Sequence, residues 1–345
     1  MQMPQIIDVD KLNLKETISL ISKLYYDTKF EEAKLLLQCA FKKAKKADQS
    51  SDAFRKDLTK LYGFAGDILG ELNDFTESLK YYESYQCLKM QLKTNLFKDT
   101  EEPDTIHLYQ FRRFTDYNLA NLINKELTLS KPTEMNDIVD SLVYAWLDSP
   151  TFGETAQNKL HLAPYKESFR DYRICSFCED NPDKRQYAIQ NTLMWSHYAD
   201  NHKGFCVDYL VHKDDYRRDN FSEISASRIF RINYYDPDNN ENKNFDLENL
   251  LSPVNLSTSD AFITKYKDWS YENEVRLLQY KPKQGALREQ YKLSPNTKIV
   301  AVYFGYRCPD ADIQIIKNLL GNTGVKFYKM DVDFSNVYKL QHKEV

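Results

Sequence analysis

Apolar residues recur every three or four positions along the first hundred residues, which is the spacing of amphipathic helices. Two stripes carry the pattern: Leu14, Ile18, Ile21, Leu24 and Tyr25, then Leu36, Leu37, Ala40, Phe41 and Ala44. The same spacing recurs on both sides of the turn at 72–75. Because each helix has a single apolar face, it must pack against a neighbour, so residues 1–100 are expected to form helical hairpins.

The second pair of helices resembles a tetratricopeptide repeat. Gly66 stands where two helices would cross, Phe75 follows the turn, and Ser78 is a second small residue for the return helix. The offset from Phe30 to Phe75 exceeds the usual period of about 34 residues, so the repeats are long or degenerate. Such hairpins either bind a protein partner or form a helical cap buried against the rest of the chain. Both interpretations stay open.

A polar stretch with a proline, Lys98–Thr105, separates this region from a second one with different spacing. We therefore divide the chain into a helical region (1–100), a linker (101–106) and a domain at 107–345. That domain alternates irregularly between short β-branched or aromatic runs and helical stretches, which predicts an α+β fold and not a doubly wound sheet. The expected strands are His107–Arg112, Leu127–Ser130, Tyr172–Cys178, Gly204–Leu210, Arg228–Tyr235, Glu274–Tyr280, Ile299–Gly305 and Val325–Asp331. The expected helices are Asp116–Lys125, Asn191–Ala199, Ala261–Lys267 and Asp310–Leu320.

Composition excludes several classes of protein. Only 9 glycines occur, and neither GxGxxG nor GxxxxGK[ST] is present, which argues against Rossmann dehydrogenases and P-loop enzymes. The net charge of −4 predicts no general attraction to nucleic acid or anionic membrane. No apolar run is long enough to span a bilayer. Met1–Asp10 lacks the features of a secretory signal, so we expect a cytoplasmic protein whose six cysteines are reduced.

The run from Trp269 to Arg276 carries the most distinctive charge pattern. If Glu272–Tyr280 is a strand, Glu272, Glu274 and Arg276 project from one face, because side chains alternate along a strand. Two carboxylates beside a guanidinium suit a polar ligand and a developing positive charge. The alternative is an exposed strand face with an ion pair between Glu274 and Arg276 that contributes little.

Further candidates cluster around residues 194–204. His197 and Tyr198 lie at a helix-to-strand corner, and Gly204 would let the backbone approach a ligand closely. The alternative is a core helix whose histidine is already satisfied. Cys175-x-x-Cys178 with two downstream histidines superficially resembles a zinc site, but the spacing is longer than that of a zinc finger, and no metal site is expected.

Several runs together resemble the bacterial domain-of-unknown-function family 2971, and they occur in that family's order over most of 107–330. The runs are LYQFR (Leu108–Arg112), LTLSKPTEMND (Leu127–Asp137), ICSF (Ile174–Phe177), MWSHYADNHKGFC (Met194–Cys206), WSYENEVR (Trp269–Arg276) and VYFG (Val302–Gly305). Ile138 stands where the family favours proline, and Cys178 where serine is common. Membership of this family does not name an activity.

A second resemblance does suggest one. Arg112 on a first strand, Ser176 on a middle strand and Glu272-x-Glu274 on a later one are similar to the Arg–Ser–Glu arrangement of ADP-ribosyltransferases. The resemblance implies a split sheet with NAD as the substrate. Glu274 would stabilise the ribose cation, and Glu272 would position or activate the acceptor.

The same resemblance assigns roles to the other residues. Arg112 would hold the pyrophosphate, Ser176 would brace the site, Tyr198 would stack on nicotinamide, and His197 would contact ribose or phosphate. Tyr109 and Trp269, which belong to the same motifs, complete the set of candidate cofactor-binding residues.

The resemblance also implies a biological setting. The enzyme would be a toxin or phage-defence effector that modifies a protein or nucleic-acid acceptor, with the helical region recognising a partner or trigger. The polar insertion Asp236–Ser259 would admit the acceptor. Two alternatives remain: a non-catalytic module that binds a nucleotide or protein, and a metal-assisted hydrolase using His197, His202 and a carboxylate.

Overall fold

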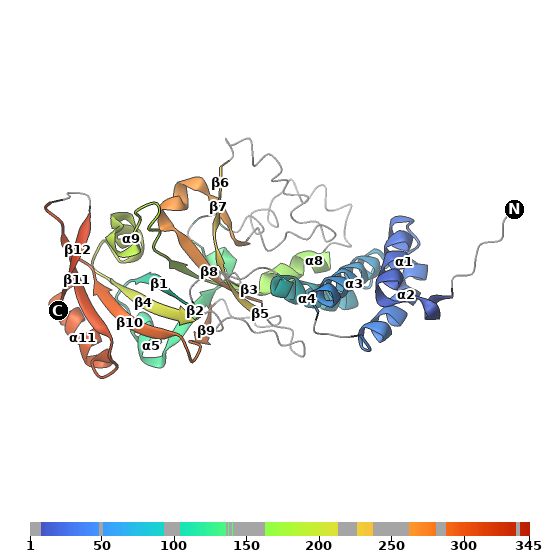
Figure 1. The fold of residues 1–345 in the computed structure, drawn as a ribbon, viewed down its shortest axis with the longest axis horizontal. Coiled ribbons are helices and arrows are strands. Elements are labelled where there is room, and N and C mark those ends of the chain that lie inside the picture. The colour runs from blue at the N-terminus through green and yellow to red at the C-terminus, as the bar shows by residue number, and fades with distance from the viewer. Residues whose placement is uncertain are drawn as a thin grey trace.

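A computed structural model describes residues 8–47, 51–92, 104–135, 137, 140, 163–212, 226–236, 262–280, 288–335 and 339–345. A helical region comes first and a mixed region of strands and helices follows (Figure 1), which confirms the predicted α+β class. In this described part of the chain, no helix combines the length and the apolar character that crossing a membrane requires.

The helical region consists of two hairpins in which consecutive helices pack on one another. Their helices are α1 (Leu14–Tyr26), α2 (Phe30–Ala44), α3 (Asp52–Glu71) and α4 (Phe75–Leu92). Helix α1 begins with a reciprocal cap: the Asn13 side chain accepts from the Glu16 amide, and the Glu16 carboxylate accepts from the Asn13 amide. The apolar stripes read from the sequence form one buried cluster between α1, α2 and α3.

Helices α3 and α4 cross closely at Gly66. A Cβ atom placed on Gly66 would lie 2.7 Å from the Tyr82 ring, so only glycine allows this approach. The Ser78 hydroxyl donates a 2.7 Å hydrogen bond to the Gly66 carbonyl across the same crossing. The close contact agrees with the small residues predicted at the crossing, while the tetratricopeptide resemblance itself stays a prediction.

Ten strands of the described chain form one sheet. Eight of them follow the order β12-β11-β10-β4-β1-β3-β2-β9, and β8 pairs with both β3 and β5. The strands are β1 (Thr105–Arg112), β2 (Glu126–Ser130), β3 (Tyr172–Cys178), β4 (Phe205–His212), β5 (Ala226–Arg231), β8 (Glu274–Tyr280), β9 (Arg288–Lys292), β10 (Lys298–Phe304), β11 (Lys326–Val332) and β12 (Leu340–Glu344). Two further short strands, β6 (Asn233–Tyr235) and β7 (Thr264–Tyr266), pair separately.

Strand β3 is the point at which the sheet divides. One edge of β3 pairs with β8 over its whole length. The other edge meets two different strands: β1 pairs at Tyr109 with Cys178, and β2 pairs at Ser130 with Ile174. Strands β1 and β2 therefore separate over the middle of β3, and a gap opens between them.

Helices cover both faces of the sheet and create two apolar layers. On one face, α5 (Asp116–Asn124) and α11 (Asp310–Leu320) pack on alternate residues of β4 and β10. On the other face, α9 (Thr192–Tyr198) places Trp195 against Phe111 of β1, with ring centroids 5.0 Å apart. Burial of the alternate residues holds each strand in register, because a shift by one position would expose the whole apolar set.

Helix α4 joins the two regions. Its residues Tyr82 and Tyr85 belong to the same buried cluster as Tyr172 of β3 and Tyr280 of β8. The Tyr172 hydroxyl also donates a 3.2 Å hydrogen bond to the Gln86 side chain. Helix α4 is thus buried against the α+β region, as the cap interpretation requires, whereas α1 and α2 extend away from the sheet (Figure 1).

Some predicted elements differ from those observed. The helix expected at Ala261–Lys267 is wrong, because Thr264–Tyr266 is strand β7 and residue 261 lies outside the described ranges. The single strand expected at Arg228–Tyr235 is two strands separated at Ile232. Of the linker expected at 101–106, residues 101–103 lie outside the described ranges, and β1 already begins at Thr105.

Candidate functional site

A cavity of about 390 Å³ lies where β1 and β2 separate from each other along β3. Residues of β1, β2 and β3 line it together with α9 and the segment that leads into β8. Seven of the eight candidate residues from the sequence are among the lining residues: Tyr109, Arg112, Ser176, His197, Tyr198, Glu272 and Glu274. These residues are distant in the sequence, and the division of the sheet brings them together.

Residues on both faces of the sheet line the cavity. Ser176 and Glu274 face the α9 side, because they share the alternation of Cys178, which packs against Tyr109 and Trp195. Arg112 pairs with Phe205, which packs on the opposite side, so its side chain leaves the opposite face of β1. A ligand that contacts both Arg112 and Glu274 must therefore pass through the gap between β1 and β2.

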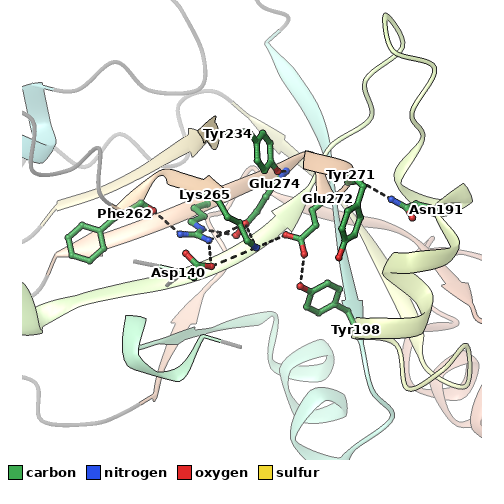
Figure 2. A network of polar contacts seen from close by, with 10 residues as sticks. Asp140, Asn191, Tyr198, Tyr234, Phe262, Lys265, Tyr271, Glu272 and Glu274 are labelled. Carbon is green, nitrogen blue, oxygen red and sulfur yellow. Dashed lines mark hydrogen bonds and ion pairs between the residues drawn. The ribbon is translucent and has the colours of Figure 1, made fainter. Parts of the chain in front are cut away.

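The wall near β8 holds a buried cluster of charged side chains (Figure 2). Lys265 of β7 is its centre, with Nζ 2.7 Å from Glu272 Oε2 and 3.1 Å from Glu274 Oε2. All three side chains are about 3% exposed, so water contributes little to their solvation. Burial of ionised groups is tolerated only when they pair with opposite charges, and this arrangement provides that pairing.

Arg276 completes the cluster from the next position on the same face of β8. Its Nε donates to Glu274 Oε1 at 2.7 Å, and its Nη2 donates to Asp140 Oδ2 at 2.6 Å. A third donor, Nη1, reaches the Phe262 carbonyl at 2.9 Å. The guanidinium is fully buried, so the exposed ion pair considered as the alternative is wrong: Glu274 and Arg276 do pair, but inside the protein.

Glu272 occupies a different element from the one predicted. It ends a 3-10 helix, η8 (Lys267–Glu272), and Asn273 then adopts a left-handed conformation with φ 44° before β8 begins. Asparagine adopts this conformation more readily than most residues. Its Nδ2 also donates a 2.7 Å hydrogen bond to the Glu179 carbonyl, which fixes the turn to a distant segment of the chain. The sequence predicted that strand alternation would place Glu272 and Glu274 on one face. The turn at Asn273 instead brings both carboxylates to Lys265.

The two carboxylates have opposite pKa shifts. Burial alone would raise the pKa of Glu274, but Arg276 and Lys265 outweigh it and lower the pKa to about 2. Burial raises the pKa of Glu272, and Lys265 only partly counteracts it while Glu274 adds repulsion. Glu274 is therefore anionic at every physiological pH, and Glu272 is the carboxylate better suited to take up a proton.

Helix α9 contributes Tyr198 and His197. The Tyr198 hydroxyl donates a 2.5 Å hydrogen bond to Glu272 Oε1, so Glu272 is held by Tyr198 on one oxygen and by Lys265 on the other. His197 is exposed and lies near Tyr271, with ring centroids 6.5 Å apart. The helix itself is positioned by the Asn191 cap, whose side chain also donates to the Tyr271 carbonyl at 2.8 Å.

Ser176 lies at the middle of β3, where the sheet divides. Its hydroxyl is buried beside Glu274 and helps to lower the pKa of that carboxylate. Within the described residues, the hydroxyl has no partner at good hydrogen-bond distance and angle. Its carbonyl accepts from the Gln110 side chain at 3.1 Å. The carbonyl of Ser176 therefore faces β1, and its hydroxyl is buried at the wall of the cavity beside Glu274.

Two candidates have different roles from those predicted. Trp269 is not among the residues lining the cavity, and its ring centroid lies 4.7 Å from Lys265 Nζ. It therefore contacts the cation of the cluster. Gly204 was expected to admit a ligand, but a Cβ atom there would lie 2.1 Å from the Arg112 carbonyl. Gly204 therefore permits a close approach to the backbone of Arg112 at the end of β1, and not to a ligand.

The residues considered for a zinc site do not converge. Cys175 and Cys178 face opposite sides of β3 and belong to different apolar clusters. His202 lies parallel to Trp195 with ring centroids 6.5 Å apart, and its Nε2 lies 3.2 Å from the Ser196 hydroxyl. Among the described residues, no three His, Cys, Asp or Glu side chains are grouped as metal ligands.

Comparison with known families bears on one part of the site. Residues 194–277 match the family model described as "Protein of unknown function (DUF2971)". This span supports the family expected for the C-terminal region and includes most of α9, Lys265 and both Glu272 and Glu274. Arg112 and Ser176 lie outside it. No curated protein and no solved structure matches the chain.

Sequence reasoning missed Lys265 and Asp140. Lys265 fell in a stretch predicted to be a helix, and a lone lysine there carries no signal. Asp140 lies 136 residues before Arg276, its partner, so no local pattern connects them. The acceptor insertion predicted at Asp236–Ser259 lies outside the described residues except for Asp236.

Proposed function

We propose that the cavity binds NAD and that this protein is an ADP-ribosyltransferase-like enzyme. One observation carries the proposal: Arg112, Ser176 and Glu274, selected in that order along the chain, line a single cavity where the sheet divides. A cavity with a few converging polar groups and shifted pKa values is the usual location of an active site. The toxin or phage-defence role implied by the resemblance belongs to the same proposal.

The proposed chemistry begins with the bond between ribose and nicotinamide. That bond breaks, its electron pair leaves with nicotinamide, and positive charge develops on the ribose, as in glycoside cleavage. Glu274 is suited to stabilise this charge because its low pKa keeps it ionised in a site with little water. Such fixed electrostatic stabilisation contributes a few kcal/mol to a reaction barrier.

Glu272 would act on the acceptor. An acceptor O–H or N–H attacks the ribose carbon, a new bond to that carbon forms, and the proton passes to the Glu272 carboxylate. Burial raises the pKa of Glu272 more than Lys265 lowers it, which suits a general base. Tyr198 and Lys265 each hold one oxygen of Glu272 and so orient it.

Arg112 and Ser176 would bind the dinucleotide. The guanidinium of Arg112 suits the pyrophosphate because arginine presents several donors to phosphate oxygens. Ser176 supplies a buried hydroxyl and backbone groups at the gap. The two lie on opposite faces of the sheet, so the dinucleotide would pass between β1 and β2, with its pyrophosphate toward Arg112 and its nicotinamide ribose toward Glu274.

The test uses the full-length protein with NAD labelled on the adenylate, alone and with cell extract. The expected result is release of nicotinamide and transfer of label to an acceptor. The rates of both should be at least 100-fold lower in Glu274→Gln. Glu126→Gln, on strand β2 of the same sheet but outside the cavity, is the matched control and should retain activity. Absence of any nicotinamide release, or equal release by Glu274→Gln, contradicts the proposal.

A specific observation also favours a non-catalytic module as the second candidate. Both oxygens of Glu274 are already engaged, one by Arg276 and the other by Lys265 and Arg276. A carboxylate held in this way would bind a ligand without reacting. In that case NAD or a related nucleotide would raise the melting temperature without turnover, and Glu274→Gln would change affinity alone.

A further inference from the structure

A second cavity lies in the helical region, away from the sheet. It has a volume of about 360 Å³ and is bounded by α1, α3 and one residue of α4. Three aromatic side chains contribute to its walls, namely Tyr26, Phe64 and Tyr85. Its lining also includes Asp67, an acidic residue that the proposed function does not use.

Asp67 is buried without a cation. The residue is 2% exposed, and its Oδ1 accepts a 2.5 Å hydrogen bond from the Tyr82 hydroxyl. Tyr82 is in turn fixed by its contact with Gly66, so the hydroxyl cannot move away freely. Within the described residues, no lysine, arginine or histidine forms a salt bridge with Asp67.

A buried carboxylate in this setting is energetically unfavourable. The pKa of Asp67 rises from 3.8 to about 7. Burial is the main cause and nearby Glu71 adds to it, while the hydrogen bond from Tyr82 acts in the opposite direction. None of these influences is a positive charge. A cation placed beside Asp67 would therefore gain a pairing that the protein itself does not supply.

The surrounding groups suit an organic cation. Aromatic faces attract ammonium and guanidinium groups, most strongly where water is excluded. Tyr85 is 1% exposed, whereas Tyr26 is 62% exposed and stands at the opening. Ser19 and Gly63 leave room between α1 and α3, so an extended chain can place one long side chain beside Asp67.

We propose that this cavity binds the side chain of a lysine or arginine in an extended segment of a partner protein. The carboxylate of Asp67 would pair with the charged group, and Phe64 and Tyr85 would contact its aliphatic part. Exposed Lys15 and Lys60 lie at the same cavity and would face acidic residues beside the basic one. The occupant is thus a basic residue flanked by acidic residues.

The affinity should depend on pH through Asp67. The groups around it are Tyr82, Glu71, Tyr25 and Tyr85, together with Asp57, Lys15 and Lys60 of the cavity. Buried Lys89 lies behind Tyr85 and donates a 3.1 Å hydrogen bond to its hydroxyl. The pKa values of Tyr25 and Tyr85 are also raised, chiefly by burial, so both tyrosines stay neutral. Asp67 is therefore the group that changes charge near neutral pH, and binding of a cation should strengthen as pH rises from about 6 to about 8.

The experiment uses the full-length protein and ligand-observed NMR with four simple probes: the N-acetyl methylamides of lysine, arginine, norleucine and glutamate. The lysine and arginine amides should bind, and norleucine, which lacks the charge, should bind at least tenfold more weakly. Asp67→Asn should lose at least tenfold in affinity for lysine amide. Asp57→Asn, the same change at the same cavity, should lose less than threefold.

Each outcome decides the proposal. Equal binding of norleucine and lysine, preferred binding of the glutamate amide, or unchanged affinity in Asp67→Asn overturns it. The rise in wild-type affinity for lysine amide between about pH 6 and about pH 8 is a second measurement that needs no variant, and its absence overturns the proposal as well. NAD turnover plays no part in these measurements, so the result stands apart from the function proposed for the other cavity.

Discussion

Lys265 Nζ lies 2.7 Å from Glu272 Oε2, and this buried ion pair connects strand β7 to the last residue of the 3-10 helix before β8. The same ammonium lies 3.1 Å from Glu274. One cation therefore holds both Glu272 and Glu274 at the wall of the cavity. The geometry of the candidate site depends on a residue that no motif had indicated.

Replacement of Lys265 by methionine should destabilise the protein strongly. The change leaves Glu272 and Glu274 buried with less positive charge, and such a loss costs about 3–5 kcal/mol in free energy of unfolding. Urea denaturation measures it. Lys267→Met is the matched control, because its pair with Asp236 is about one-third exposed and should contribute at most about 1 kcal/mol. Equal losses in the two variants would show that the cluster is not the cause.

Tyr198→Phe should move the pH dependence of the proposed reaction. A base must be deprotonated to act, so nicotinamide release should decrease as pH falls through the pKa of Glu272. The Tyr198 hydroxyl favours the ionised form of Glu272, and its removal should raise that pKa and shift the acid limb to higher pH. Glu274, with a pKa of about 2, stays ionised throughout.

Rates measured from about pH 4 to about pH 9 check this prediction. Tyr187→Phe changes an exposed tyrosine and should leave the acid limb where it is in the wild type. A limb unmoved in Tyr198→Phe, or moved equally in both variants, contradicts the role assigned to Glu272.

Gly204→Ala should disturb the strand that carries Arg112. A methyl group at position 204 would lie 2.1 Å from the Arg112 carbonyl, and backbone must shift to relieve that contact. We expect a loss of about 2 kcal/mol or more in free energy of unfolding, in the range of overpacked substitutions. Gly324→Ala meets no atom within 4 Å and should cost only about 1 kcal/mol for its left-handed backbone. A smaller loss at 204 than at 324 in thermal denaturation contradicts the prediction.

Asp67→Asn should stabilise the protein, more so at higher pH. In the wild type the folded protein holds a proton on Asp67 up to about pH 7, whereas the unfolded chain releases it near pH 3.8. Stability from this group is therefore present at low pH and is lost as pH rises toward the folded pKa. The advantage of the variant should grow by roughly 2–3 kcal/mol between pH 5 and pH 8.

Urea denaturation at the two pH values measures this difference. Asp57→Asn makes the same change at a half-buried residue of the same cavity and is the matched control. An advantage of Asp67→Asn that is the same at both pH values would mean that the carboxylate is paired or hydrated in solution.

Several elements could be predicted because their signal is local. The bounds of β3, β8 and α11 agree with those expected from the runs Tyr172–Cys178, Glu274–Tyr280 and Asp310–Leu320. Each is a continuous run with its own periodicity and a polar boundary. Short segments lack that signal: Thr264–Tyr266 is too brief for its spacing to distinguish a strand from a helix, and β9 and β12 were not expected at all.

By itself the sequence determined an α+β region after a helical one, and it selected residues of three strands that line one cavity. Periodicity and residue type suffice for this, because they are properties of neighbouring positions. Only the tertiary structure decided that Lys265 joins the two glutamates, that Arg276 reaches Asp140, and that Asp67 is buried without a cation. Charge, burial and pKa depend on groups brought together from distant parts of the chain, and these distances arise only when the chain is folded.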